Sequence, residues 1–210
     1  MENQVVIRPR QQILGPDFMS IQQNAQDSID HIVKDMLVNG PGYSGLTVTA
    51  PAAAQVSVAA GRYANAEGAI FASSELVQNL QTMLPGAAKK LVAVVVYAPA
   101  PYVDTDIQQR KFRINVETNQ VEPDDVPMRR ARLANVSFLQ GIEDASPQLP
   151  AIGAQSLQVA TLTLTPTGVE SIAMIDENRM SNLDVVEALA QANNTQINLI
   201  MGLFTTLRSD

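Results

Sequence analysis

The chain has 210 residues, 46% of them hydrophobic, with a mean hydropathy of +0.01. This suits one large domain, or one domain with helical extensions, with a real core, and it argues against global disorder. A formal charge of -7 and a pI of ≈ 4.7 argue against a broad nucleic-acid-binding surface. No apolar run approaches the roughly 20 residues that span a bilayer. The absence of cysteine excludes disulfides and thiolate metal sites.

The N-terminal part of the chain predicts an arm followed by a helix. Residues 1–16 have no core of their own, and two interpretations stay open: a frayed terminus, or an arm that is ordered by docking on an adjacent subunit. Its first four residues lack the pattern of a secretory signal, so we expect synthesis in the cytoplasm. Residues 17–39 form the expected helix, with Asp17 as cap and Asn39-Gly40-Pro41 as stop. One face repeats apolar residues at an average step of 3.6 and could dock a partner: Phe18, Ile21, Ala25, Ile29, Ile32 and Met36.

Residues 45–178 predict a β-structured body, because the apolar period changes from 3.6 to 2 after the Gly40-Pro41-Gly42 break. Leu91–Ala98 is apolar on both faces and predicts a buried central strand. The stretch 75–84 fits either a helix or a strand, and we favour a strand or irregular structure. No strand–helix–strand alternation occurs, which argues against a parallel nucleotide-binding sheet.

The second half of the body carries further strand and loop signals. Residues 111–117 alternate as a half-exposed strand, and 122–127 are expected to form an acidic loop. Another strand is expected from Arg129 to about Phe138. Residues 158–165 and 169–175 flank a Pro-Thr-Gly turn and predict a hairpin. The expected fold class is therefore mainly β with flanking α: an antiparallel β-sandwich or barrel-like body between two helices.

Residues 181–208 predict a C-terminal oligomerisation helix of coiled-coil type. Its seam follows spacings of three and four over about four heptads: Leu183, Val186, Ala190, Asn193, Ile197, Ile200, Phe204 and Leu207. An apolar period of 3.5 residues describes a seam for another helix, and the wide stripe suits a trimer or larger bundle, or a second helix from the same chain. Asn193 at a core position would fix register and strand number. The alternative is that this helix packs back on its own domain.

The sequence offers few residues for catalysis or cofactor binding. Asp104 with Asp106, and Glu122 with Asp124 and Asp125, could bind a hard cation, but they lack the pattern of a calcium loop, and solvated acidic loops are the better interpretation. The one histidine, His31, has no second ligand nearby. The basic cluster Arg129, Arg130 and Arg132 is expected to form salt bridges with a neighbouring subunit. No nucleophile elbow, phosphate-binding loop, dinucleotide fingerprint or zinc spacing occurs, so we expect no enzyme, no cofactor and no metal.

Two runs of the body resemble a known class of proteins. They are the stretch from Val56 to Ile70, which contains Gly61-Arg62-Tyr63 and the turn Asn65–Gly68, and the closing stretch from Leu149 to Arg179. Both are similar to segments of baseplate and tail-fibre proteins of tailed bacteriophages. The resemblance implies a trimeric β-structured body linked to helical segments, with a structural role in the host-attachment apparatus.

The expected function is that of a structural virion protein of a phage tail: a homotrimeric connector or adaptor in a baseplate or proximal fibre. Its expected partners are its own copies and other tail or baseplate proteins, with no nucleic acid and no membrane insertion. It would be made in the host cytoplasm and reside in the virion. One alternative is a glycan-binding or glycan-cleaving module with Tyr63, Tyr97 or Tyr102 as platform. Another is a tail-fibre assembly chaperone, which would be absent from finished particles.

Overall fold

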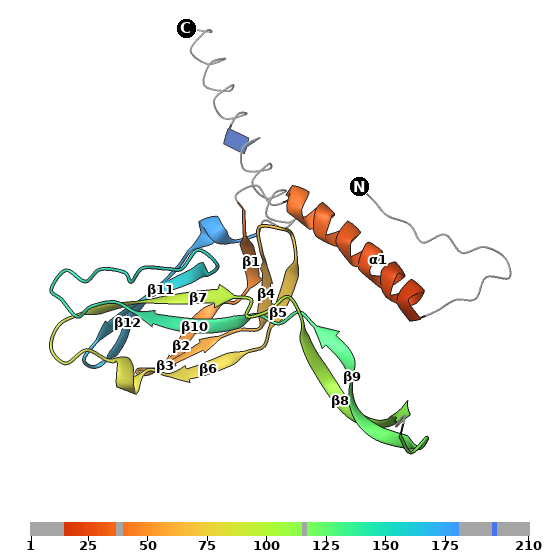
Figure 1. Cartoon of the computed structure of the whole chain (residues 1–210). Coiled ribbons are helices and arrows are strands. Elements are labelled where there is room, and N and C mark those ends of the chain that lie inside the picture. Colours follow the sequence, from red (N-terminus) through yellow and green to blue (C-terminus); the bar gives the residue numbers. More distant parts are fainter. Residues whose placement is uncertain (1–14, 37–39, 115–116, 181–194, 197–210) are drawn as a thin grey trace, which may run out of the picture. The chain divides into compact units, whose positions relative to one another are not determined.

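A computed structural model describes residues 15–36, 40–114, 117–180 and 195–196 (Figure 1). The chain divides into two units, Met1–Arg179 and Met180–Asp210. In the second unit the described residues are Met180 and the exposed helical pair Thr195 and Gln196. All eight residues of the expected C-terminal seam therefore lie outside the described residues, as do most of the N-terminal arm.

The expected N-terminal helix is present as α1 (Gly15–Met36). It begins two residues before Asp17, with Pro16 in the first turn, where its missing N–H breaks no helical hydrogen bond. Asp17 in the first turn and Lys34 in the last both complement the helix dipole. Of the helices that the structure describes, none combines the length and apolar character needed to cross a membrane.

The strands of the described body form four small antiparallel sheets that do not close into a barrel. The first sheet has the order β1 (Gly42–Gly45), β4 (Gly61–Ala64) and β5 (Ile70–Ser73). The second has the order β2 (Val48–Ala52), β3 (Gln55–Val58) and β6 (Leu76–Asn79). The third has the order β10 (Asn135–Gln140), β7 (Lys90–Tyr97), β11 (Leu157–Thr165) and β12 (Gly168–Met174). The fourth pairs β8 (Val103–Ile114) with β9 (Val121–Ala131). Two short 3-10 helices, η1 (Gln81–Met83) and η2 (Asp176–Asn178), complete the elements.

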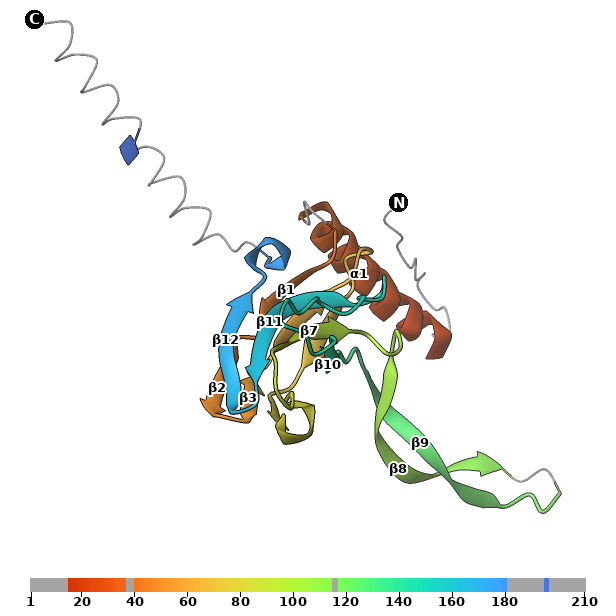
Figure 2. The same ribbon diagram turned by 90° about the vertical axis from the view of Figure 1, so that its left-hand side faces the viewer.

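Three of these sheets share one hydrophobic core. Strand β7 lies between β10 and β11 (Figure 2), and its run from Val92 to Val96 is buried, as its apolar sequence predicts. Alternate residues of β11 and of the first two sheets complete the core. Its buried aliphatic members outside β7 include Leu46, Val48, Val56, Val58, Leu80, Val159, Leu162 and Leu164.

Backbone hydrogen bonds connect the sheets around this core. The Val169 N–H donates to the Ala53 carbonyl at 2.7 Å, which joins β12 to the β2–β3 turn. Ala72 in β5 donates to the Arg132 carbonyl at 3.0 Å and accepts from Ala134 at 2.9 Å. The chain just before β10 is thereby tied to the first sheet.

Tyr43 in β1 anchors the start of the body to its end. The residue is 0% exposed, and its hydroxyl donates to the Ile175 carbonyl at 3.1 Å, with the Val159 carbonyl at 3.4 Å. Burial, followed by the charge of Asp176, raises the pKa of the Tyr43 phenol above its ordinary value. The hydroxyl therefore remains a donor at all ordinary pH values.

The β8–β9 ribbon corrects the sequence-based boundaries of this region. The segment 122–127 is part of β9, so the prediction of a loop there was wrong, and β8 begins eight residues before the expected strand at Lys111. Pro123 and Pro127 misled the prediction. In a two-stranded ribbon both strands are edges, so an N–H that faces outward can be replaced by proline without loss of a ladder bond. The hairpin β11–β12, in contrast, matches its predicted bounds closely, and β6 with η1 occupies the ambiguous stretch 75–84.

Candidate interaction surface on helix α1

Helix α1 contacts the β-structured body through its polar face. The Asp30 carboxylate accepts two hydrogen bonds from Arg132, Nη1 to Oδ1 and Nη2 to Oδ2, each 2.7 Å long. The two side chains are 14% and 13% exposed. Arg132 Nη2 also donates to the Tyr102 hydroxyl at 3.1 Å, and that hydroxyl donates to Gln26 Oε1 at 3.0 Å. We refer to Asp30, Arg132, Tyr102 and Gln26 as the polar clamp.

The clamp combines several interactions of one guanidinium. Arg132 Cζ lies 5.1 Å from the centroid of the Tyr102 ring, within the range of a cation–π contact. The hydrogen bonds to Asp30 raise the pKa of Arg132 above its ordinary value, against the lowering effect of burial. A planar guanidinium that binds a carboxylate through two parallel bonds fixes direction as well as distance. The clamp therefore sets the orientation of α1 on the body.

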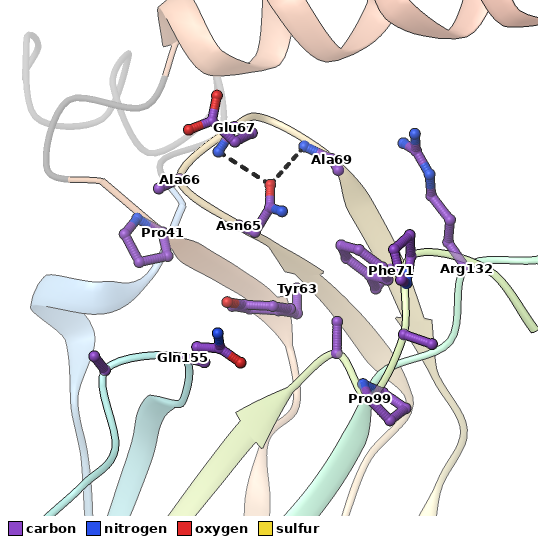
Figure 3. Close-up of a pocket in the computed structure, with 14 residues that line it drawn as sticks. Pro41, Tyr63, Asn65, Ala66, Glu67, Ala69, Phe71, Pro99, Arg132 and Gln155 are labelled. Carbon is purple, nitrogen blue, oxygen red and sulfur yellow. Dashed lines mark hydrogen bonds between the residues drawn. The ribbon is translucent and has the colours of Figure 1, made fainter.

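A second contact lies at the β4–β5 turn. Asn65 Oδ1 accepts hydrogen bonds from the backbone N–H groups of Glu67 at 3.1 Å and Ala69 at 2.9 Å, which shape the turn (Figure 3). Lys34 Nζ donates to Glu67 Oε2 at 2.7 Å, and this bond lowers the pKa of Glu67. Gly68 has a φ of +82° and is buried against the backbone of α1.

Gly68 is required at this position for two reasons. A Cβ there would overlap the Asp30 carbonyl oxygen and lie 2.6 Å from the Lys34 backbone nitrogen. The positive φ also disfavours any residue with a side chain. The helix backbone thus rests directly on the turn, and a glycine in this turn is what permits the approach.

The apolar stripe of α1 faces away from these contacts. Its large members are all exposed: Phe18 58%, Ile21 42%, Ile29 55%, Ile32 60% and Met36 70%. Ala25 is exposed as well, and no residue of α1 is buried. At about 100° per residue, the centre of the stripe lies roughly 140° around the helix from the centre of Gln26, Asp30 and Lys34. The residues expected to dock a partner therefore form one continuous exposed surface.

A pocket of about 580 Å³ lies between the β4–β5 turn and the residues that follow β7. Figure 3 shows Pro41, Pro99, Tyr63 and Phe71 along it, with Gln155 on one side. Among the described residues that line it, the charged side chains are Glu67 and Arg132, and both are paired with residues of α1. The other described lining residues are proline, alanine, aromatic and amide side chains, so the described lining presents no unpaired acid or base for catalysis.

The tyrosines required by a glycan site are not arranged as exposed platforms. Tyr63 is 5% exposed and tilts against Phe71 with ring centroids 6.0 Å apart. Burial raises the pKa of Tyr63. Tyr102 is engaged in the clamp, and Tyr97 at the end of β7 is half-buried. Stacking on a sugar would require an accessible ring face, which Tyr63 does not offer.

The acidic and basic clusters of the sequence come together across the β8–β9 ribbon. Asp104 lies opposite Arg130, and their side chains meet at 3.0 Å. Asp106 lies 3.8 Å from Arg129. The third arginine of the cluster, Arg132, binds Asp30. The acidic partners of all three arginines therefore come from the same chain, whereas the sequence led us to expect acids of a neighbouring subunit. Among the residues that the structure describes, no group of three or more acids or histidines is placed to hold a metal ion. The side chains of Glu122, Asp124 and Asp125 are not among those described.

Comparisons of the chain with protein families, with curated proteins and with solved structures find no match. The site must therefore be interpreted from its own geometry. Sequence reasoning identified the stripe but missed the clamp, because Asp30 and Arg132 are 102 positions apart and neither stands in a local motif. The glycine of the Asn65–Gly68 turn was visible in the sequence, but its contact with α1 was not.

Proposed function

We propose that this chain is a structural component of a phage tail, a homotrimeric connector in a baseplate or proximal tail fibre that acts by docking and not by catalysis. The observation that carries the proposal is the orientation of α1. The helix is fixed to its own body by its polar face, and its apolar stripe faces outward.

This orientation is the reverse of what a surface helix normally adopts. An amphipathic helix of a globular domain turns its apolar stripe to the core and its polar face to water. Here Arg132 and Tyr102 bind the polar face, and the apolar side chains are 42% to 70% exposed. A continuous exposed apolar surface is typical of a protein–protein interaction site. The helix is thus better suited to an assembly than to an isolated subunit.

The β-structured body supports the same role. Three of its described sheets share one core, from which we infer a sandwich-like body, and a β-structured body is what the phage resemblance implies. Among the described strands, the β8–β9 ribbon pairs with no other sheet, and an isolated two-stranded ribbon is at best marginally stable in water. Neighbouring subunits that cover the ribbon and the α1 stripe would account for both features.

The first test is the solution mass of the full chain by light scattering. The proposal expects three times the chain mass of 22.6 kDa for the wild type. The double variant Ile197→Asp with Ile200→Asp places two carboxylates per chain in the expected seam, where burial of each costs several kcal/mol unless it is protonated. That variant should have a lower mass. The control, Thr195→Asp with Gln196→Asp, changes two exposed positions between seam residues and should remain trimeric.

The outcomes separate the proposal from its alternatives. A monomeric wild type contradicts a trimer that forms without other tail proteins. Purified particles of the phage that encodes the chain should also contain it in stoichiometric amount. Its absence from finished particles would contradict the structural role and support the assembly chaperone.

A further inference from the structure

We propose that the apolar stripe of α1 packs against the same stripe of other copies of this chain, with the helices parallel. This inference rests on the proposed function, a connector that self-assembles, and adds to it a second contact far in the sequence from the C-terminal seam. Four features carry it: the straightness of the stripe, the lack of another matching surface, the charges beside it, and the clamp behind it.

The stripe is straight and long. Its six members follow steps of three, four, four, three and four from Phe18 to Met36, which is 18 residues in five steps. A period of 3.6 matches the helix itself, so the stripe neither drifts nor imposes a supercoil. The 22 residues of α1 span about 33 Å. Two such stripes can therefore remain in contact along the whole helix.

Within the described surface, α1 is the only element with a continuous apolar face. Of the large hydrophobic residues exposed there, six belong to α1: Phe18, Met19, Ile21, Ile29, Ile32 and Met36. The others lie on separate strands or loops: Val77, Ile107, Leu133, Ile142 and Leu149. A second copy therefore offers one described surface of matching length, its own α1. Copies that meet through the same element around one rotation axis form a closed symmetric oligomer.

The charges beside the stripe select the parallel orientation. By the helical period, Asp17 and Asp35 lie on one flank of the stripe, and Gln22 and Val33 lie on the other. In an antiparallel pair equal flanks meet, which would bring Asp17 near Asp35 of the second copy at both ends. In a parallel pair the acidic flank meets the neutral flank. Like charges on adjacent helix positions are destabilising, so the parallel pair is favoured.

The clamp leaves the stripe free to make this contact. Asp30, Gln26 and Lys34 face the body from roughly the opposite side of the helix. Association through the stripe thus requires no rearrangement of α1. Parallel helices also place the copies around an axis along α1, the symmetry that a cyclic trimer needs.

Single cysteines introduced into the full chain test the contact directly, because the chain has none of its own. Ile32→Cys lies on the stripe near the end of α1, and in a parallel bundle it meets the same residue of another copy. The Cα atoms of such pairs fall within the roughly 4.4–6.8 Å that a disulfide bridges. After mild oxidation most of the Ile32→Cys chain should migrate as a disulfide-linked dimer on a non-reducing gel. Ser20→Cys, an exposed position roughly opposite the stripe, is the matched control and should remain monomeric on the gel.

A mixture of Ile21→Cys and Ile32→Cys distinguishes the orientations. In an antiparallel pair these two positions meet each other, and mass spectrometry of the linked peptides would detect a 21–32 disulfide without the 32–32 disulfide. That result overturns the parallel arrangement, and the absence of any stripe disulfide overturns the contact itself. Light scattering on the same samples separates the two proposals. If the chain is a trimer but forms no stripe disulfides, the contact through α1 is refuted and the proposed C-terminal seam is not. If stripe disulfides also form in the Ile197→Asp and Ile200→Asp background, they support the contact through α1 independently of that seam.

Discussion

Replacement of Arg132 by methionine should release α1 from the body. Arg132→Met retains most of the side-chain length but removes the charge, so the Asp30 carboxylate, 14% exposed, loses both of its 2.7 Å hydrogen bonds from the guanidinium. Removal of one partner from a buried pair costs about 3–5 kcal/mol. Since both groups retain some contact with water, we expect about 2–3 kcal/mol. This corresponds to roughly a 30- to 150-fold change in the docking equilibrium of the helix, at a factor of ten for each 1.4 kcal/mol.

Hydrogen–deuterium exchange of the α1 peptides measures this equilibrium, with urea unfolding of the whole chain as the second readout. The control is Arg130→Met, two positions earlier on the same segment. Arg130 meets Asp104 at 3.0 Å, but the two side chains are 64% and 46% exposed. Exposed pairs contribute little, so this variant should change the stability by about 0.5 kcal/mol or less.

The comparison of Arg132→Met with Arg130→Met decides whether the clamp holds α1 on the body. If Arg132→Met and Arg130→Met leave the same protection in α1, the clamp does not hold the helix, and its short distances have no energetic consequence. A further check is the double variant Arg132→Met with Asp30→Asn. It removes the unpaired charge together with the bonds, so it should recover part of the loss, with a coupling energy of about 0.5–3 kcal/mol.

Three further substitutions test other contacts. Gly68→Ala should undock α1, because a Cβ meets its backbone, and raise exchange in the helix, whereas Gly86→Ala, with nothing within 4 Å, should not. Glu143 accepts hydrogen bonds from three backbone N–H groups of the Gly86–Ala88 loop, which lower its pKa from 4.5 to about 2. Its stabilisation is therefore complete above pH 4.5 and lost as the pH falls towards 2, so the difference in urea midpoint between wild type and Glu143→Gln should vanish over that range. Tyr43→Phe removes the hydroxyl that donates to the Ile175 carbonyl at 3.1 Å, while the Asn178 N–H still donates to that carbonyl at 3.2 Å, so the free energy of unfolding should fall by about 0.5–1.5 kcal/mol.

The elements that could be predicted are those whose pattern lies within the element itself. The 3.6-residue period from Phe18 to Met36 was sufficient to predict α1, which begins two residues before the expected start, while the expected end at residue 39 lies outside the described residues. The apolar run 91–98 predicted a central strand because burial on both faces leaves no polar alternation. The hairpin β11–β12 followed from two alternating runs around a proline–glycine turn.

The features that could not be predicted depend on residues far apart in the chain. Strand β9 contains Pro123 and Pro127, and only its partner β8 shows that this segment is a strand. The clamp joins Asp30 to Arg132, two residues that separately resemble any exposed acid and any member of a basic cluster. Helical periodicity, for the same reason, reveals that an apolar stripe exists but not which side of the helix the body occupies.

In the assembly that we propose, the two faces of α1 contribute differently, and this division would explain why the helix is fixed by charges. A bidentate ion pair defines a direction but adds limited stability, since desolvation offsets much of its attraction. Apolar burial is non-directional, yet each half-exposed isoleucine or methionine of the stripe can contribute about 1 kcal/mol when a partner covers it. If the stripe were packed on the body, that free energy would stabilise the monomer and be unavailable for association. With Asp30 and Arg132 orienting the helix, the stripe retains its full contribution for the contact between copies. A chain with a released clamp should therefore still associate through α1, but without a fixed orientation of its β-structured bodies.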